Sequence, residues 1–194
     1  LLPLSSALTP NVSRTRMTGS VKSANLCNPF LSGVMKLNRE TVALRALVEQ
    51  VAAMFRIEAQ NKGLEFVFSL PPNLPTWVLA DERRLRQVLI NLLSNAIKYT
   101  ETGSVTLSVR YRSMVAEFEV ADTGIGIAPE LIDKIFDPFF TTKDLGQGTG
   151  LGLPTTLSII KSHGGWITVE SEPGRGSEFH VYLPASRDVE ATPG

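Results

Sequence analysis

The sequence predicts a two-layer α/β sandwich in which helices cover one face of a sheet. Segments with the 3.6-residue apolar period of amphipathic helices are interspersed along the chain with segments that alternate like strands. Short turns bearing Gly or Pro join the later alternating segments, which is typical of antiparallel pairing. A length of 194 residues is enough for one substantial domain with its own core and an appended segment.

Residues 1–38 carry scattered Ser, Thr, Asn and Pro without either period, so we expect a poorly structured linker there. The pattern changes at Asn38–Thr41, after which an apolar stripe predicts an amphipathic helix that ends at Gly63. That stripe consists of Leu44, Leu47, Val48, Val51 and Phe55. The periods are lost again after Pro184, so the expected domain spans residues 39–185 and is followed by a disordered tail, 186–194.

Asp81 is a suitable N-cap for a second helix, which we expect to run to Tyr99 before Gly103 breaks the pattern. Its core stripe is Leu85, Val88 or Leu89, Leu92 and Ala96. A short helix is expected over 129–136, and another over 150–163 that Gly164 ends. Strands are expected at 64–70, 77–80, 104–110, 115–121, 166–171 and 177–183.

The composition excludes several classes of function. With 19 basic and 19 acidic residues, the chain offers no global electrostatic case for nucleic acid or an anionic membrane surface. Cys27 is the single cysteine, which excludes an internal disulfide or a cysteine-based zinc site and fits a reducing compartment. No apolar run reaches the ~18 residues of a membrane span, and the first residues of the given sequence lack the basic start and cleavage pattern of a signal peptide. We expect a cytoplasmic fragment without membrane contact. Because the chain begins with Leu1, a membrane anchor elsewhere in a parent protein stays open.

The second predicted helix carries a polar face opposite its apolar stripe. Asn91, Asn95 and Lys98 fall at i, i+4 and i+7, with Tyr99 beside them. Neutral amide oxygens suit a magnesium ion that already has phosphate and water ligands, and Asn95 is the best candidate for the metal ligand. The alternative for two asparagines alone is a solvated helix face.

Asp122 ends a predicted strand and is followed by Thr-Gly-Ile-Gly. A carboxylate at the mouth of this turn can accept a hydrogen bond from an adenine amino group, while Gly124 and Gly126 allow backbone to approach a flat ring. The alternative is a plain turn that ends the strand.

A loop that could cover phosphate follows. Phe136, Phe139 and Phe140 either pack in the core or anchor a mobile lid, and one residue set can do both. The glycines that precede the next helix suit phosphate binding at a helix N-terminus, and Lys143 can add positive charge at the γ-phosphate unless it is a simple solubilising group. These glycines, Gly148, Gly150 and Gly152, match neither the P-loop nor the dinucleotide fingerprint.

Two further features are weak signals. Gly174-Arg175-Gly176-Ser177 is explained by a hairpin turn, although Ser177 could line an adenine pocket. The two histidines do not suggest a nucleophile or a metal ligand, because His163 sits at a helix end and His180 in a strand.

In this order, the segments 91–100, 122–126, 136–140, 148–153 and 174–177 resemble the N, G1, F, G2 and G3 boxes of the catalytic, ATP-binding domain of bacterial-type sensor histidine kinases. These kinases belong to the wider superfamily of gyrase, Hsp90 and MutL. The resemblance covers about residues 39–185 and implies a Bergerat-type fold, with a mixed, mostly antiparallel sheet backed by three helices. It implies ATP and Mg²⁺ as cofactors under a movable lid, here short as in the nitrogen-regulator type.

The resemblance also implies roles for single residues. Asn95 would be the magnesium ligand, Asn91 its companion, Lys98 a phosphate contact, and Tyr99 a neighbour of the ribose. Asp122 would read the adenine amino group, with Ser177 supporting it through water, and Phe136 and Phe140 would anchor the lid. Asn91, Lys98 and Lys143 are the expected catalytic residues. The expected nucleotide-binding residues are Asn91, Asn95, Lys98, Tyr99, Asp122, Gly124, Gly126, Ile127, Phe136, Phe140, Lys143, Gly148, Thr149, Gly150, Leu151, Gly152 and Ser177.

The phosphoacceptor of that family is a histidine on an upstream helical hairpin, and residues 1–38 contain no histidine. We therefore expect residues 1–38 to be a linker or a remnant of the dimerisation region, and the fragment to be a monomer. A separate histidine-bearing dimerisation domain would accept the γ-phosphoryl group and relay it to a response regulator. The alternatives are another ATPase or a serine kinase of the superfamily, and a degenerate nucleotide-sensing module.

Overall fold

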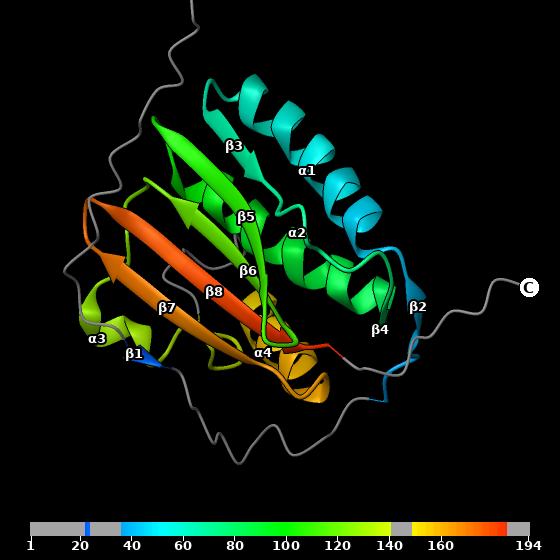
Figure 1. The fold of residues 1–194 in the computed structure, drawn as a ribbon. Coiled ribbons are helices and arrows are strands. Elements are labelled where there is room, and N and C mark those ends of the chain that lie inside the picture. The colour runs from blue at the N-terminus through cyan, green and yellow to red at the C-terminus, as the bar shows by residue number, and fades with distance from the viewer. Residues whose placement is uncertain (1–21, 24–35, 141–148, 186–194) are drawn as a thin grey trace, which may run out of the picture.

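The computed structural model describes residues 22–23, 36–140 and 149–185, with side chains described from residue 36 onward. The predicted fold class is confirmed: a sheet forms one layer and α1 (Leu44–Asn61), α2 (Glu82–Tyr99) and α4 (Gly152–Ser162) form the other (Figure 1). A single turn, α3 (Pro129–Ile132), is shorter than the helix predicted over 129–136. Most of the expected linker 1–38 and the expected tail 186–194 lie outside the described residues.

The sheet is mixed and mostly antiparallel, as expected. Its strand order is β1-β7-β8-β6-β5-β3, and the described parallel pair is β3 with β5. The strands are β1 (Lys22–Ser23), β3 (Glu65–Ser69), β5 (Ser104–Arg112), β6 (Val115–Asp122), β7 (Trp166–Glu172) and β8 (Gly176–Pro184). The hairpins β5–β6 and β7–β8 are joined by pairing between β6 and β8, so strands from distant parts of the chain meet in the middle of the sheet.

Helix α1 begins at Leu44, the first residue of the predicted stripe, but the residues just before it form a strand that the sequence analysis did not predict. Residues Glu40–Val42 form β2, which pairs antiparallel with β4 (Val78–Ala80) in a separate two-stranded sheet. The partner strand lies almost forty residues away, and an apolar stripe carries no information about so distant a pairing. The same pairing shows that the predicted strands 64–70 and 77–80 belong to different sheets.

Helix α2 begins and ends much as the sequence predicts. The Asp81 side chain accepts a hydrogen bond from the backbone N–H of Arg84 at 3.0 Å, which satisfies one of the helix's free donors. At the other end, Lys62 Nζ donates to the carbonyl of Ile97 at 2.6 Å. Both ends of the helix that carries the predicted metal ligand are therefore fixed.

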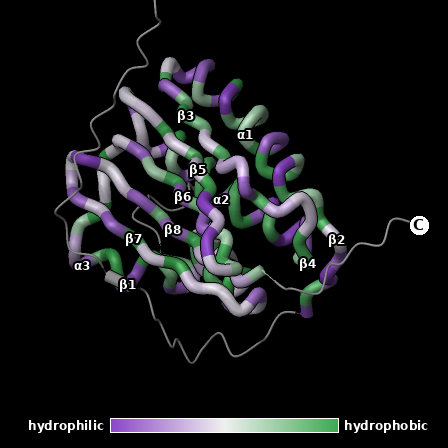
Figure 2. Tube along the Cα trace, in the orientation of Figure 1, coloured by the Kyte–Doolittle hydropathy of each residue, from purple (hydrophilic) through white to green (hydrophobic). Residues whose placement is uncertain are grey.

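The core lies between the helices and one face of the sheet. Apolar and polar residues alternate along its elements (Figure 2). The predicted stripe of α2 is buried, including both Val88 and Leu89. It packs into one cluster with α1, α4 and the inward residues of β5, β6 and β8, among them Leu47, Phe55, Leu157, Leu107, Phe118 and Val181.

His163 joins the end of α4 to the start of α2. Its Nδ1 lies 2.9 Å from the carbonyl oxygen of Ile159 and donates to it, so Nε2 accepts from the backbone N–H of Asp81 at 3.3 Å. The carboxylate of Asp81 also accepts from the N–H of Asn38 at 2.9 Å. The chain entering the domain and the two helices therefore meet at one point.

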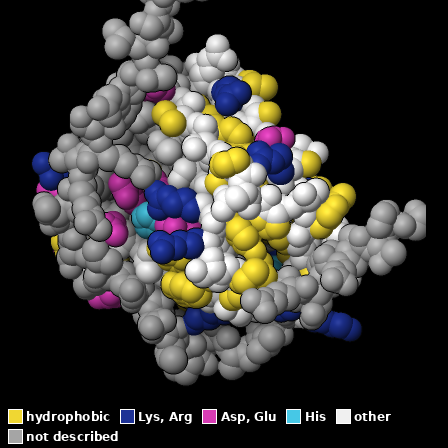
Figure 3. Space-filling model, viewed as in Figure 1, with side chains coloured by type: hydrophobic (Ala, Val, Ile, Leu, Met, Phe, Trp, Pro, Cys, Tyr) yellow, Lys and Arg dark blue, Asp and Glu magenta, His cyan; other side chains and the backbone are white. Residues whose placement is uncertain are grey.

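His180 lies instead on the open face of the sheet. Its Nδ1 is 3.1 Å from Glu117, its Nε2 is 3.6 Å from Glu178, and Arg110 bonds both Glu117 and Glu119. Basic, acidic and histidine side chains gather over the sheet on this face (Figure 3). The hydrogen bonds with Glu178 and Glu117 raise the pKa of His180 against the effect of burial, whereas burial lowers the pKa of His163.

The two histidines are expected to give opposite pH dependence. Because the folded pKa of His163 is depressed, its contribution to the unfolding free energy is lost as pH falls below about 6.5. The contribution of His180 is present below about pH 6.5 and is lost as pH rises through its raised folded pKa. Relative to the parent, His163→Gln should gain stability on acidification from about pH 7 to pH 5, and His180→Gln should lose stability. Urea denaturation across this range measures both, and pH curves parallel to the parent would contradict the assignment.

Candidate nucleotide-binding site

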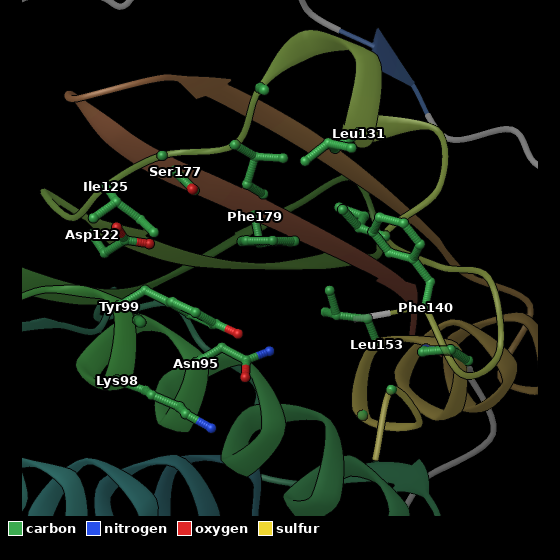
Figure 4. Close-up of a pocket in the computed structure, with 18 of the residues that line it drawn as sticks. Asn95, Lys98, Tyr99, Asp122, Ile125, Leu131, Phe140, Leu153, Ser177 and Phe179 are labelled. Atoms are coloured by element: carbon green, nitrogen blue, oxygen red, sulfur yellow. The ribbon is translucent and has the colours of Figure 1, made fainter. Parts of the chain in front are cut away.

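A cavity of about 570 Å³ opens between α2, the α3 segment, the start of α4 and the ends of β6 and β8 (Figure 4). Asp122 and Ile125 lie at one end of it, Phe140 and Leu153 at the other, and Asn95, Lys98 and Tyr99 line it from α2. Of the other predicted site residues, Gly126, Ile127, Thr149, Gly150, Gly152 and Ser177 also line it. Segments 91–100, 122–127 and 149–152, which are separate in the sequence, thus meet around one space.

Asp122 is the buried acid of this cavity. It is the last residue of β6, where strand pairing sets it opposite Ser177 of β8, and 8% of its surface is exposed. The N–H of Gly124 donates to Asp122 Oδ1 at 2.8 Å, and a backbone hydrogen bond from Ser177 also reaches the carboxyl group. Burial raises the pKa of Asp122 above its ordinary value, against the effect of these two hydrogen bonds. The carboxyl is therefore held rigidly at the end of the cavity.

A hydroxyl network supports the wall beside Asp122. Ser171 Oγ lies 3.0 Å from Ser177 Oγ and donates to the carbonyl of Gly176 at 2.8 Å. It also accepts from the N–H of Ile127 at 2.8 Å. Ser171 thus connects the β7–β8 hairpin to the turn that follows Asp122. The sequence analysis did not predict this role for Ser171.

The glycines after Asp122 approach protein backbone rather than open space. A Cβ at Gly124 would lie 2.4 Å from the Tyr99 carbonyl oxygen, and one at Gly126 would lie 2.1 Å from the Glu172 carbonyl oxygen. Gly126 also has a φ of +69°, which L-residues with side chains rarely adopt. These glycines allow the turn to pack between α2 and the β7–β8 hairpin.

Gly126→Ala is expected to lower the unfolding free energy by ~2 kcal/mol or more, because it combines a positive φ with a backbone clash. Gly174→Ala is the matched control, since Gly174 has a φ of +77° and nothing within 4 Å of its added Cβ. The control should cost only the ~1 kcal/mol of the left-handed backbone. Urea denaturation of both variants measures the difference, and equal losses would show that the contact with Glu172 is unimportant.

Asn91 and Asn95 lie in different surroundings. Asn95 lines the cavity, where its amide points inward (Figure 4). The Asn91 amide nitrogen donates to the Gly152 carbonyl at 3.1 Å and to Thr156 Oγ1 at 3.2 Å, and Asn91 is not among the lining residues. In this structure, Asn91 joins α2 to the first turn of α4, while Asn95 faces the space where a ligand would bind.

The first turn of α4 borders the cavity. The N-cap residue Leu151 makes no side-chain capping bond, and Thr149, Gly150 and Gly152 line the cavity beside it. Helix N-terminal N–H groups and the positive end of the helix dipole favour an anion. Leu151, which was also expected to bind nucleotide, is 41% exposed and is not among the residues that line the cavity.

The three phenylalanines occupy three different environments. Phe136 is 1% exposed in the core, and Phe140 packs against the core and lines the cavity. Phe139 is 74% exposed with a φ of +66°, and its N–H donates to the Gly150 carbonyl at 3.0 Å. Residues 139 and 150, which lie on either side of segment 141–148, are therefore joined beside the cavity. Lys143 and Gly148 lie in that segment, outside the described residues.

Sequence reasoning missed the apolar lining. Phe179 follows Ser177 on the inward face of β8, and strand alternation could have identified it. Leu131, Ile135 and Leu153 contribute from the α3 segment and α4, and their periodicity indicated only burial. No residue pattern distinguishes an apolar side chain that lines a cavity from one that fills the core.

The donor chemistry of the cavity fits Mg²⁺ together with a triphosphate. Among the described residues, no group of three His, Cys, Asp or Glu side chains could hold a metal ion. The Asn95 amide oxygen is a suitable single protein ligand for a hard ion that takes its other oxygens from phosphate and water.

Residues 80–187 match the family model described as "Histidine kinase-, DNA gyrase B-, and HSP90-like ATPase". The chain belongs to this family. It is 40% identical over 157 residues to the aerobic respiration control sensor protein ArcB of Escherichia coli, covering 78% of this chain and 20% of that protein. It is 38% identical over 161 residues to the adaptive-response sensory kinase SasA of Crocosphaera subtropica, covering 81% and 42%.

Solved structures agree. Full-length ShkA in complex with AMPPNP matches with a TM-score of 0.72 at 37% identity, covering 79% of this chain and 32% of that one. The catalytic domain of histidine kinase ThkA matches with a TM-score of 0.67 at 36% identity, covering 76% and 96%. Within its family, the chain is thus an ATP-binding catalytic domain of the sensor histidine kinase class. It spans between a fifth and about two fifths of the curated relatives named above. No helix in the described part of the chain is long and apolar enough to cross a membrane.

Proposed function

We propose that this domain binds Mg-ATP in the cavity and transfers the γ-phosphoryl group to a histidine on a separate dimerisation domain, for relay to a response regulator. The observation that carries the proposal is that the two ends of the cavity carry different chemical groups. A buried carboxyl held by backbone hydrogen bonds lies at one end, and an amide, a lysine and the start of α4 lie along the remaining wall. Such an arrangement suits a ligand with a hydrogen-bonding base at one end and anionic groups at the other.

Adenine fits the Asp122 end. The carboxyl can accept a hydrogen bond from the exocyclic amino group, while Ile125, Ile127 and Phe179 supply apolar contact to the ring. Tyr99 then lies beside the ribose. ShkA, a structural neighbour, was solved with the ATP analogue AMPPNP, which supports an adenine nucleotide as the ligand here.

The phosphates fit between Asn95, Lys98 and the start of α4. Bound Mg²⁺ would offset the negative charge on the triphosphate, with the Asn95 oxygen as its protein ligand. Lys98, and Lys143 from the loop, would add positive charge. Asn91 would keep the α4 N–H groups in position for the phosphates, because its amide bonds Gly152 and Thr156.

The transfer needs an acceptor outside the described domain. A histidine ring nitrogen would attack the γ-phosphorus in line as the bond to the β–γ bridging oxygen breaks, leaving phosphohistidine and ADP. Neither His163 nor His180 suits this role, because both ring nitrogens of each contact other groups of the domain. A histidine on a dimerisation domain is the remaining kind of acceptor.

The test combines binding with transfer. Calorimetric titration with AMPPNP should show binding that Mg²⁺ strengthens, and γ-labelled ATP should then label a histidine-bearing dimerisation hairpin from a relative. Acid-labile, base-stable label on that hairpin supports a histidine kinase. Label on a serine-bearing partner, or ATP hydrolysis without transfer, would instead identify another enzyme of the superfamily. Absence of AMPPNP binding would indicate a degenerate module.

A further inference from the structure

In the described part of the chain, only the two residues of β1 pair with the outer side of β7, and β7 lacks the features that usually prevent strand addition. β7 has the sequence Trp-Ile-Thr-Val-Glu-Ser-Glu, with no proline and no lysine. Exposed sheet edges commonly carry such residues, because unpaired N–H and C=O groups otherwise accept another strand. Trp166 at its start is 43% exposed and stacks on Tyr182 at 4.9 Å between ring centroids. The edge is therefore suited to main-chain pairing.

This edge is acidic. Glu170 of β7 lies directly opposite Glu178 of β8, and like charges in that register repel each other. Glu172 ends the same strand and is ion-paired at 2.9 Å with the exposed Arg175. β7 itself carries no basic residue. A basic segment would bind here with less electrostatic cost than a neutral or acidic one.

The start of the chain has the complementary charge. Residues 1–39 contain five basic residues and no acidic residue, although the whole chain has no net charge. Residues 40–194 therefore carry an excess of five acidic residues. Three of the basic residues, Arg14, Arg16 and Lys22, lie within ten residues of one another, and we name residues 14–23 the basic arm.

One part of the basic arm already pairs with this edge. β1 is antiparallel to β7, with Lys22 opposite Val169 and Ser23 opposite Thr168 (Figure 1). We propose that the β7 edge is a strand-addition site whose ligand is the basic arm of the same chain. Main-chain hydrogen bonds supply the pairing, as in other cases of β-augmentation, and the opposite net charges supply attraction.

The position of the edge links the arm to the nucleotide cavity. β7 carries Ser171, whose hydroxyl accepts from the N–H of the cavity residue Ile127 at 2.8 Å. An arm paired with β7 lies along the strand that supports this wall. The region preceding the domain is thereby held against the domain at a second place, besides the entry point where Asn38 bonds Asp81.

The single cysteine allows a direct test on the full chain. Cys27 lies four residues after Ser23, so a nitroxide on its sulfur is at most ~14 Å of chain from the paired residues. In isotope-labelled protein, the amide signals of β7 should broaden strongly, while those of β3 at the opposite edge keep their intensity. The reduced, diamagnetic label gives the reference spectrum. Equal broadening of β3 and β7, or none at β7, would overturn the proposal.

Charge and chain identity are tested in the same experiment. The triple variant Arg14→Gln, Arg16→Gln, Lys22→Gln should lose most of the broadening. The parent should also lose it in ~1 M salt, where the Debye length is only ~3 Å. Lys36→Gln with Arg39→Gln, which removes basic residues outside the arm, should keep it. Broadening that survives both the triple variant and salt would rule out the electrostatic attraction. A mixture of isotope-labelled Cys27→Ser chain and spin-labelled unlabelled chain should show no broadening, and broadening there would identify a second copy as the ligand.

Discussion

Asp122→Ala is expected to weaken AMPPNP binding by about 10- to 100-fold, the range typical for losing a hydrogen bond to a charged group. The carboxyl is buried at the end of the cavity, and bonds from Gly124 and Ser177 fix its orientation. Those bonds hold it ready to accept from the adenine amino group. Calorimetric titration at constant Mg²⁺ measures the change.

A second ligand separates adenine recognition from general damage. The parent chain should bind purine riboside triphosphate, which lacks the 6-amino group, about as weakly as Asp122→Ala binds ATP. Asp122→Ala should bind ATP and purine riboside triphosphate equally well, because without the carboxyl the 6-amino group of ATP has lost its hydrogen-bond acceptor. A variant that still prefers ATP by the parental factor would remove Asp122 from the adenine contact. Urea denaturation of Asp122→Ala measures how much stability the fold loses when the N–H groups of Gly124 and Ser177 lose their acceptor.

Asn95→Ala is expected to abolish the strengthening of AMPPNP binding by Mg²⁺ while leaving metal-free binding within about twofold. Loss of a direct ligand should lower metal affinity by at least the ~10- to 100-fold that loss of an outer-shell group costs. Titrations of nucleotide with and without Mg²⁺ measure the two quantities separately.

Asn91→Ala is the matched control, one helical turn away on the same helix. Its amide joins α2 to Gly152 and Thr156 of α4, so the variant should weaken binding with and without Mg²⁺ by a similar factor. Equal behaviour of the two variants would contradict the division of roles between Asn91 and Asn95. A selective loss of the Mg²⁺ effect in Asn91→Ala would make Asn91 the metal ligand.

Much of the fold was predictable because its elements have strong local signals. The apolar stripe of α2 and its Asp81 cap indicated both the helix and its start, and the structure confirms them. The hairpins β5–β6 and β7–β8 follow from alternation and short turns. β2 was missed because three residues give no period, and what makes them a strand is pairing with distant β4.

The candidate site likewise has features that the sequence could predict and features that it could not. The segments around Asn95, Asp122 and Gly150 could be selected from residue type and order, and the structure brings them to one cavity. The contact of Asn91 with α4 could not be foreseen, because it depends on how two helices cross. The lining by Leu131 and Phe179 depends on which apolar side chains the packing leaves beside open space.

By itself, the sequence determined the local elements, the chemical groups available for a nucleotide and the family. These properties are carried by periodicity and by residue type, which do not depend on the rest of the chain. Only the tertiary structure decided that β6 pairs with β8, and so that Asp122 lies opposite Ser177. It also decided that Gly126 packs on Glu172 and that Asn91 holds α4 while Asn95 faces the cavity. The reason is physical: strand register and side-chain direction are set by contacts between residues far apart in the chain, which no local pattern encodes.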